Sequence, residues 1–104
     1  GSEGRSVVLV KLAGQGNAYV LKFDGFRGEW NGRIVLHREA VAGSGYNYVA
    51  QVDGAPWTGL VMRSGSYEAY PVGDKGPFDV GYDEGASKAT NAQAVVEQFM
   101  KQPR

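Results

Sequence analysis

The chain has no cysteine and a single histidine, and both scarcities narrow the chemistry open to it. Without cysteine there is no disulfide, no thiolate metal site and no cysteine nucleophile. His37 alone is a poor basis for a zinc site, because zinc usually takes three or four nitrogen or sulfur ligands. As a general base it would need a nucleophile and an orienting carboxylate beside it. We therefore interpret His37 as an ordinary strand residue and expect no cofactor and no tightly bound metal.

The chain also lacks a charge excess and a long apolar run. Eleven basic and eleven acidic side chains give a formal net charge of zero, whereas nucleic-acid binders normally carry a basic excess. No apolar run approaches the roughly 18–20 residues of a membrane helix. We therefore expect no nucleic-acid partner and no membrane span. Gly1-Ser2 is typical of a cloning remnant, and we expect residues 1–5 to be disordered.

Glycine, in contrast, is abundant: 16 residues, most of them beside Asn, Asp or Ser, which is typical of turns between short strands. Asn31-Gly32 predicts a type I′ hairpin turn between a strand that ends at Trp30 and one that begins at Arg33. Ser64-Gly65 predicts a two-residue turn that pairs Arg63 with Ser66. That register places five residues on one core-facing side of two strands: Thr58, Leu60, Met62, Tyr67 and Ala69.

Only the C-terminal segment has helical periodicity. Five apolar residues form one helical stripe: Ala92, Val95, Val96, Phe99 and Met100. Thr90 and Gln93 make a T-x-x-Q capping box before it, so a helix is predicted over about 91–102. If this helix packs on its own sheet, Phe99→Ala should cost about 3–5 kcal/mol.

The fold expected for residues 1–104 is a single α+β domain. Its body is an antiparallel meander of seven or eight short strands, curled into a small barrel or a strongly bent sheet because strand twist accumulates. The one amphipathic helix then plugs an end of this sheet or covers a face of it.

Aromatic residues are concentrated late in the sequence. Of the six Tyr, four Phe and two Trp, seven fall within residues 46–82. Alternation places Tyr46 and Tyr48 on one face of a strand, and Tyr67 and Tyr70 on opposite faces. Tyrosines on strands fill cores, but they also build recognition surfaces. We therefore take these four tyrosines as candidate binding residues.

The acidic residues Asp79, Asp83 and Glu84 offer two further alternatives. Oxygen ligands in a loop suit a loosely bound calcium ion, although these residues lack the order of an EF-hand loop. Paired carboxylates would also suit a small carboxylate-dependent hydrolase. A solvated loop is the simplest interpretation, and no nucleophile-elbow, zincin, phosphate-loop or dinucleotide motif occurs. We therefore do not expect an enzyme.

Residues 44–48 read S-G-Y-N-Y and match the motif S-G-x-x-Y. This motif resembles the one carried by the bacterial periplasmic or membrane-bound inhibitors of c-type lysozyme. That family consists of small antiparallel β-barrels of the cell envelope, whose motif loop inserts into the lysozyme cleft and whose serine binds the catalytic carboxylates. The resemblance implies that Ser44 and Tyr48 are inhibitory-loop residues, and that Arg63 is the nearest counterpart of a lysine on a second loop. The chain differs from the family in lacking a cysteine near its start and in ending in an amphipathic helix.

The function predicted from these observations is a small, non-enzymatic, monomeric binding domain for a protein or a small molecule. A composition rich in Gly, Tyr and Asn suggests a bacterial protein exported to the periplasm, the outer membrane or the medium. The alternatives are lysozyme inhibition, carboxylate-dependent hydrolysis, and a structural subunit that uses the helix or an edge strand as its contact. The candidate binding residues are Ser44, Tyr46, Tyr48, Arg63, Tyr67 and Tyr70.

Overall fold

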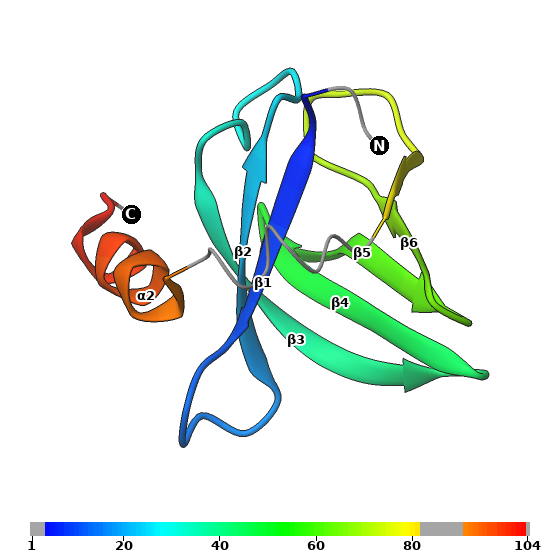
Figure 1. Cartoon of the computed structure of the whole chain (residues 1–104), viewed down its shortest axis with the longest axis horizontal. Coiled ribbons are helices and arrows are strands. Elements are labelled where there is room, and N and C mark those ends of the chain that lie inside the picture. The colour runs from blue at the N-terminus through cyan, green and yellow to red at the C-terminus, as the bar shows by residue number, and fades with distance from the viewer. Residues whose placement is uncertain (1–3, 82–90, 104) are drawn as a thin grey trace.

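The computed structural model describes residues 4–81 and 91–103. Its seven strands form one antiparallel sheet in which spatial order follows sequence order, and the sheet curls into a nearly closed barrel (Figure 1). The strands are β1 (Ser6–Lys11), β2 (Ala18–Asp24), β3 (Ile34–Ala42), β4 (Gly45–Val52), β5 (Ala55–Arg63), β6 (Ser66–Ala69) and β7 (Phe78–Val80), and the helix is α2 (Ala92–Lys101). The predicted α+β meander with one C-terminal helix is confirmed.

Tight turns set the register of the later strands. Ser64 and Gly65 both have positive φ, at 49° and 81°, and Arg63 pairs with Ser66. This is the predicted two-residue turn, since positive φ at both central residues is the mark of type I′.

The Asn31-Gly32 turn differs from its prediction. The Arg33 N–H donates to the Trp30 carbonyl at 3.0 Å, but only Gly32 has positive φ, so the turn is not type I′. No strand ends at Trp30: β2 stops at Asp24 and β3 begins at Ile34. The reason is burial, because the Trp30 ring packs 5.1 Å from the Phe23 ring and is only 5% exposed. Residues 25–33 therefore fold over one end of the barrel instead of extending as a hairpin.

A β-bulge changes the predicted face of Thr58. Tyr48 pairs with Leu60, yet the next residue, Val49, pairs with Thr58, so Gly59 is the extra residue on β5. Because Tyr48 and Val49 point to opposite faces, Thr58 does not share a face with Leu60. The remaining residues of the predicted set keep their register, with Met62 opposite Tyr67 and Leu60 opposite Ala69.

The core lies inside the barrel. Its buried members come from β2, the loop after it, and β4 to β7: Leu21, Phe23, Phe26, Trp30, Tyr48, Ala50, Leu60, Ala69 and Val80. Since Phe26 and Trp30 belong to the loop over one end, the barrel interior is filled with side chains at that end.

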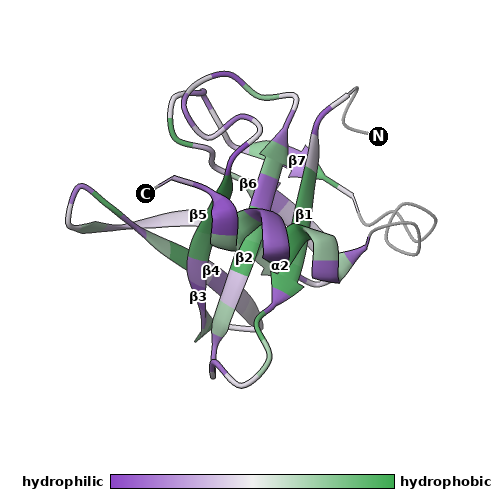
Figure 2. Cartoon of the chain, turned by 90° about the vertical axis from the view of Figure 1, so that its left-hand side faces the viewer, coloured by the Kyte–Doolittle hydropathy of each residue, from purple (hydrophilic) through white to green (hydrophobic). Residues whose placement is uncertain are grey.

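Helix α2 lies outside the barrel, over β1, β2 and β3 (Figures 1 and 2). Leu21 and Val35 pair on the inner face of these strands, so Val20 and Ile34 lie on the outer face. Val20 and Ile34 are nevertheless only 0% and 1% exposed. β2 is thus covered on both faces. The helix is fastened at its end, where the Gln102 side-chain amide accepts from the Ile34 N–H at 2.8 Å and donates to the Ile34 carbonyl at 2.6 Å.

The N-terminus of α2 differs from the predicted capping box. The N-cap is Asn91, whose Oδ1 accepts from the Ala94 N–H at 3.1 Å, and Thr90 lies outside the described residues. Asn and Thr both serve as N-caps, so the pattern alone places the start of the helix one residue early. Gln93 instead donates to Glu97 one turn along the helix. The described residues contain no helix long and apolar enough to cross a membrane.

Truncating Phe99 to alanine should cost about 1–2 kcal/mol of unfolding free energy, less than its spacing in the sequence predicts. The reason is that Phe99, Val95 and Val96 are only half-buried on the sheet. Urea unfolding measures the loss, and Met100→Ala is the matched control because Met100 is 65% exposed. Unchanged stability together with weaker self-association of Phe99→Ala would show that the stripe packs between copies of the chain.

Candidate binding site at the tyrosine end of the barrel

Three tyrosines stand at equivalent places in three strands. Tyr19, Tyr46 and Tyr67 are each the second residue of a strand, in β2, β4 and β6. In this antiparallel meander those strands all start at the same end of the sheet, after the β1–β2, β3–β4 and β5–β6 turns. Together with Tyr48 and Glu39 they form what we call the tyrosine mouth.

The mouth continues an apolar row that crosses the sheet. The register pairs Val41 with Tyr46, Tyr46 with Met62, Met62 with Tyr67, and Tyr67 with Val80. Val41 is 79% exposed and Tyr46 36%, whereas Val80 is only 8% exposed. The row thus leads from the tip of the β3–β4 hairpin, which lies beside the β5–β6 turn (Figure 1), into the core.

Glu39 places a carboxylate among these rings. The Tyr48 hydroxyl donates to Glu39 Oε2 at 2.8 Å, and the Tyr48 ring meets the Tyr19 ring edge-on at 5.2 Å. Burial raises the pKa of Tyr48 above its ordinary value of 10.0, and the hydrogen bond to Glu39 and its charge raise it further. The pKa of Tyr19 is raised by burial and then by the charge of Glu39. Both hydroxyls therefore stay protonated at neutral pH and act as hydrogen-bond donors.

The structure brings together only some of the candidate residues from the sequence. Tyr46, Tyr48 and Tyr67 meet in the mouth, and Ser44 and Arg63 are exposed beside it, at the β3–β4 and β5–β6 turns. Tyr70 is apart from them, beyond the end of β6, with its hydroxyl 3.4 Å from Glu68 Oε1 and its carbonyl bound by the Trp57 indole N–H at 2.7 Å.

The S-G-x-x-Y residues have separate structural roles. Ser44 is exposed in the turn, as an inhibitory loop requires, but Tyr48 is 4% exposed inside the barrel and does not lie at the loop tip. Gly45 lies where β4 crosses β5 closely, because a Cβ there would overlap the Met62 carbonyl oxygen. The glycine and the tyrosine of the motif are therefore explained by packing within this chain.

The acidic cluster cannot be assembled from the described residues. Asp79 is exposed on β7 opposite Glu68, while Asp83 and Glu84 lie outside residues 4–81 and 91–103. Within those residues no group of three His, Asp or Glu side chains is placed to hold a metal ion.

Sequence patterns missed two members of the mouth, Tyr19 and Glu39. Tyr19 has a signal that could have found it, since it follows a Gly-Asn turn by two residues, much as Tyr46 and Tyr67 follow theirs. Glu39 has none, because only the fold of β3 against β4 brings it to Tyr48.

The chain was compared with models of protein families, with curated proteins and with solved structures, and none of them matches it.

Proposed function

We propose that this chain is a non-enzymatic binding domain whose tyrosine mouth binds a cationic side chain, lysine or arginine, presented by a partner protein. The observation that carries this proposal is the position of the part-exposed Glu39 carboxylate, which accepts from the buried Tyr48 hydroxyl on the sheet face that also carries the part-exposed Tyr19 and Tyr46. Aromatic faces attract cations through their quadrupole, and a carboxylate adds a charge-assisted hydrogen bond.

The neighbourhood of Tyr19 favours a cation. The Lys11 ammonium of this chain already lies 6.0 Å from the Tyr19 ring centroid, at the outer limit of a cation–π contact. Among the described residues Glu39 makes no ion pair, so its charge is available to a ligand. The exposed Val41 and Tyr46 beside it supply apolar area for the rest of a protein partner.

Catalysis has less support than binding. The pKa values of Tyr19 and Tyr48 are raised, whereas an activated nucleophile or base would need a lowered pKa, so neither hydroxyl is activated. His37 is 0% exposed inside the core and does not reach the mouth's surface. Four further expectations stay predictions: hydrolysis by carboxylates, lysozyme inhibition through Ser44, export from a bacterium and a monomeric state. An activity assay with c-type lysozyme tests the inhibition.

An NMR titration with Nα-acetyl-lysine amide and Nα-acetyl-arginine amide tests the proposal. We expect saturable shifts confined to the amides of Tyr19, Glu39, Tyr46 and Tyr67, and about a tenfold weaker affinity in Glu39→Gln. Glutamine keeps an acceptor for the Tyr48 hydroxyl, so this variant removes the charge with little change in packing. Glu97→Gln on exposed helix α2 is the matched control.

Two results would overturn the proposal. One is that the neutral isostere Nα-acetyl-norleucine amide shifts the same resonances to the same extent. The other is that Glu39→Gln binds the two amides as tightly as wild type, which would leave the mouth without an electrostatic role.

A further inference from the structure

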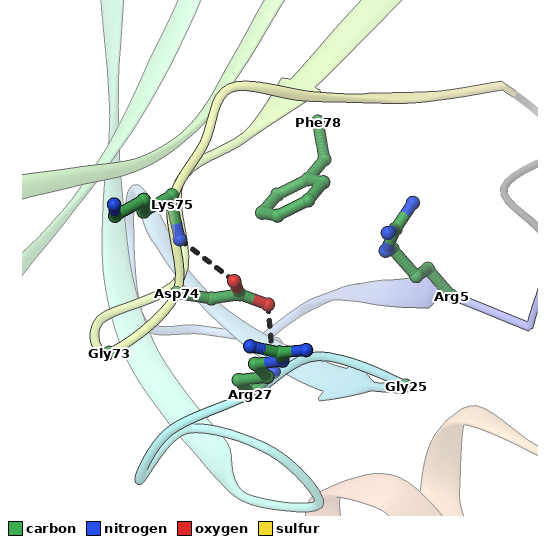
Figure 3. A pocket seen from close by; sticks show the side chains of 7 residues that line it. All are labelled: Arg5, Gly25, Arg27, Gly73, Asp74, Lys75 and Phe78. Carbon is green, nitrogen blue, oxygen red and sulfur yellow. Dashed lines mark hydrogen bonds between the residues drawn. The ribbon is translucent and has the colours of Figure 1, made fainter.

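A cavity of about 480 Å³ lies at the end of the barrel away from the tyrosine mouth (Figure 3). Three chain segments meet there: the residues before β1, the loop after β2 and the loop between β6 and β7. Each segment contributes one basic residue, Arg5, Arg27 and Lys75 in turn, and the wall between them is formed by Asp74, Phe78 and the backbone of Gly25 and Gly73. We call this cavity the cationic pocket.

The walls of the pocket are held by backbone contacts that only glycine allows. A Cβ on Gly25 would overlap the carbonyl oxygen of Gly4, and a Cβ on Gly28 would lie 2.6 Å from the Gly73 Cα. All four of these glycines have positive φ, which also favours glycine. The three segments therefore approach one another closely and in a fixed arrangement.

Asp74 fastens two of the segments together. Its Oδ2 accepts from the Arg27 N–H and its Oδ1 from the Lys75 N–H, both at 2.8 Å (Figure 3). The hydrogen bond from Arg27 is the largest cause of the lowered pKa of this carboxyl. Because both oxygens accept from backbone N–H groups, Asp74 acts as a positioning residue and its charge is partly offset.

Arg5 is exposed, and its guanidinium contacts an aromatic ring of the pocket. The guanidinium lies 4.6 Å from the Phe78 ring centroid, and Phe78 in turn packs edge-on against the buried Phe26 at 5.3 Å. Stacking on a ring uses the flat face of a guanidinium and leaves the N–H groups along its edge available. The Lys75 side chain extends away from Phe78 (Figure 3), so Arg5 and Arg27 supply the charge nearest the ring.

Within residues 4–81 and 91–103 these cations form no ion pair, and the charges of Arg27 and Arg5 act on Asp74, whose pKa they help to lower. There, no side-chain nitrogen of Arg5, Arg27 or Lys75 donates to a protein acceptor or forms an ion pair. The lining of the pocket therefore combines three positive charges with the one carboxylate of Asp74.

We propose that the cationic pocket binds a phosphate group, with Arg5 and Arg27 as its ligands. A guanidinium presents parallel N–H donors that match two oxygens of a phosphate, and two guanidiniums from separate segments suit its double charge. The volume lies within the range of small-molecule sites, so the phosphate is either free or carried by a small organic molecule. This site is independent of the tyrosine mouth, since no residue belongs to both.

Titration with inorganic phosphate at constant ionic strength, followed by amide NMR shifts, tests the proposal. We expect saturable shifts at Arg5, Arg27, Asp74 and Lys75, and about a tenfold weaker affinity in Arg5→Gln and in Arg27→Gln. Arg27→Gln leaves the backbone bond to Asp74 in place. Lys101→Gln, the same change of charge at an exposed position of helix α2 that belongs to neither site, is the matched control and should bind like wild type.

Further arms of this experiment separate phosphate from other anions. Phenyl phosphate reports the source of the group: tighter binding than inorganic phosphate supports an organic phosphate that contacts Phe78, and equal binding supports phosphate itself. Arg5→Lys and Arg27→Lys keep the charge and should still lose affinity, because lysine lacks the planar fork. Equal shifts with sodium chloride or with acetate would overturn the proposal, as would wild-type affinity in both glutamine variants.

Discussion

Replacing Gly59 by valine should lower the free energy of unfolding by about 3 kcal/mol, the upper part of the usual cost of overpacking a core. A Cβ at this position would overlap His37 Nε2 and lie 3.0 Å from Cζ3 of Trp30. Neither neighbour has room to move, since His37 is 0% and Trp30 5% exposed. The bulge at Gly59 therefore exists where β5 must pass directly against the imidazole.

Urea unfolding of Gly59→Val measures this cost, and Gly81→Val is the matched control. Gly81 has no heavy atom within 4 Å of its built Cβ and its φ is not positive, so valine there meets neither a clash nor strain. His37→Ala combined with Gly59→Val should recover part of the loss, because the smaller side chain makes room for the valine. An equal loss at positions 59 and 81 would contradict the steric explanation.

The parts of the fold that follow local rules were predictable from sequence. The Ser64-Gly65 turn needs only positive φ at two residues, and the stripe in α2 needs only its spacing. The bulge at Gly59 and the inward folding of Trp30 were not, because each depends on what lies across the barrel. The resulting register shift of one residue places Thr58 on the opposite face, and no local sequence pattern marks that shift.

The two candidate sites also differ in how far the sequence predicts them. Tyr46 and Tyr67 were identified because aromatic residues on alternating strands are visible in a sequence. Arg5 and Arg27 were missed, since each is an isolated charge in a chain of zero net charge. Only the glycine contacts between three distant segments bring them to one pocket. Sites built by long-range contacts therefore remain invisible to spacing and composition.

Acid should destabilise the protein through His37 before its carboxylates are protonated. The Val35 carbonyl oxygen lies 3.0 Å from Nδ1 and can only accept, so Nδ1 carries the proton and Nε2 is a bare acceptor. Within the described part of the chain Nε2 has no hydrogen-bond partner. The side chains packed against the ring, those of Phe23 and Trp30, do not titrate, so no neighbouring charge there would stabilise an imidazolium.

Burial lowers the pKa of His37 from its ordinary 6.5 to about 4. Between these two pH values His37 is protonated in the unfolded chain but not in the folded chain. The stability contributed by neutral His37 is therefore fully present above pH 6.5 and is lost as the pH falls toward 4. We expect a loss of about 2–3 kcal/mol between about pH 7.5 and about pH 4.5. Asp74, whose pKa is lowered, contributes stability that is lost only at lower pH, as that carboxyl becomes protonated.

Urea unfolding at several pH values separates His37 from the other titrating groups when wild type is compared with His37→Gln. The variant should be less stable at neutral pH, because it replaces a packed core side chain. Since glutamine does not titrate, the variant should then lose much less stability down to about pH 4.5. The difference between the two slopes is the contribution of the imidazole. Parallel slopes would show that His37 takes up its proton in the folded state as readily as in the unfolded one, and that its enclosure by Phe23, Trp30 and Gly59 does not exclude the charge.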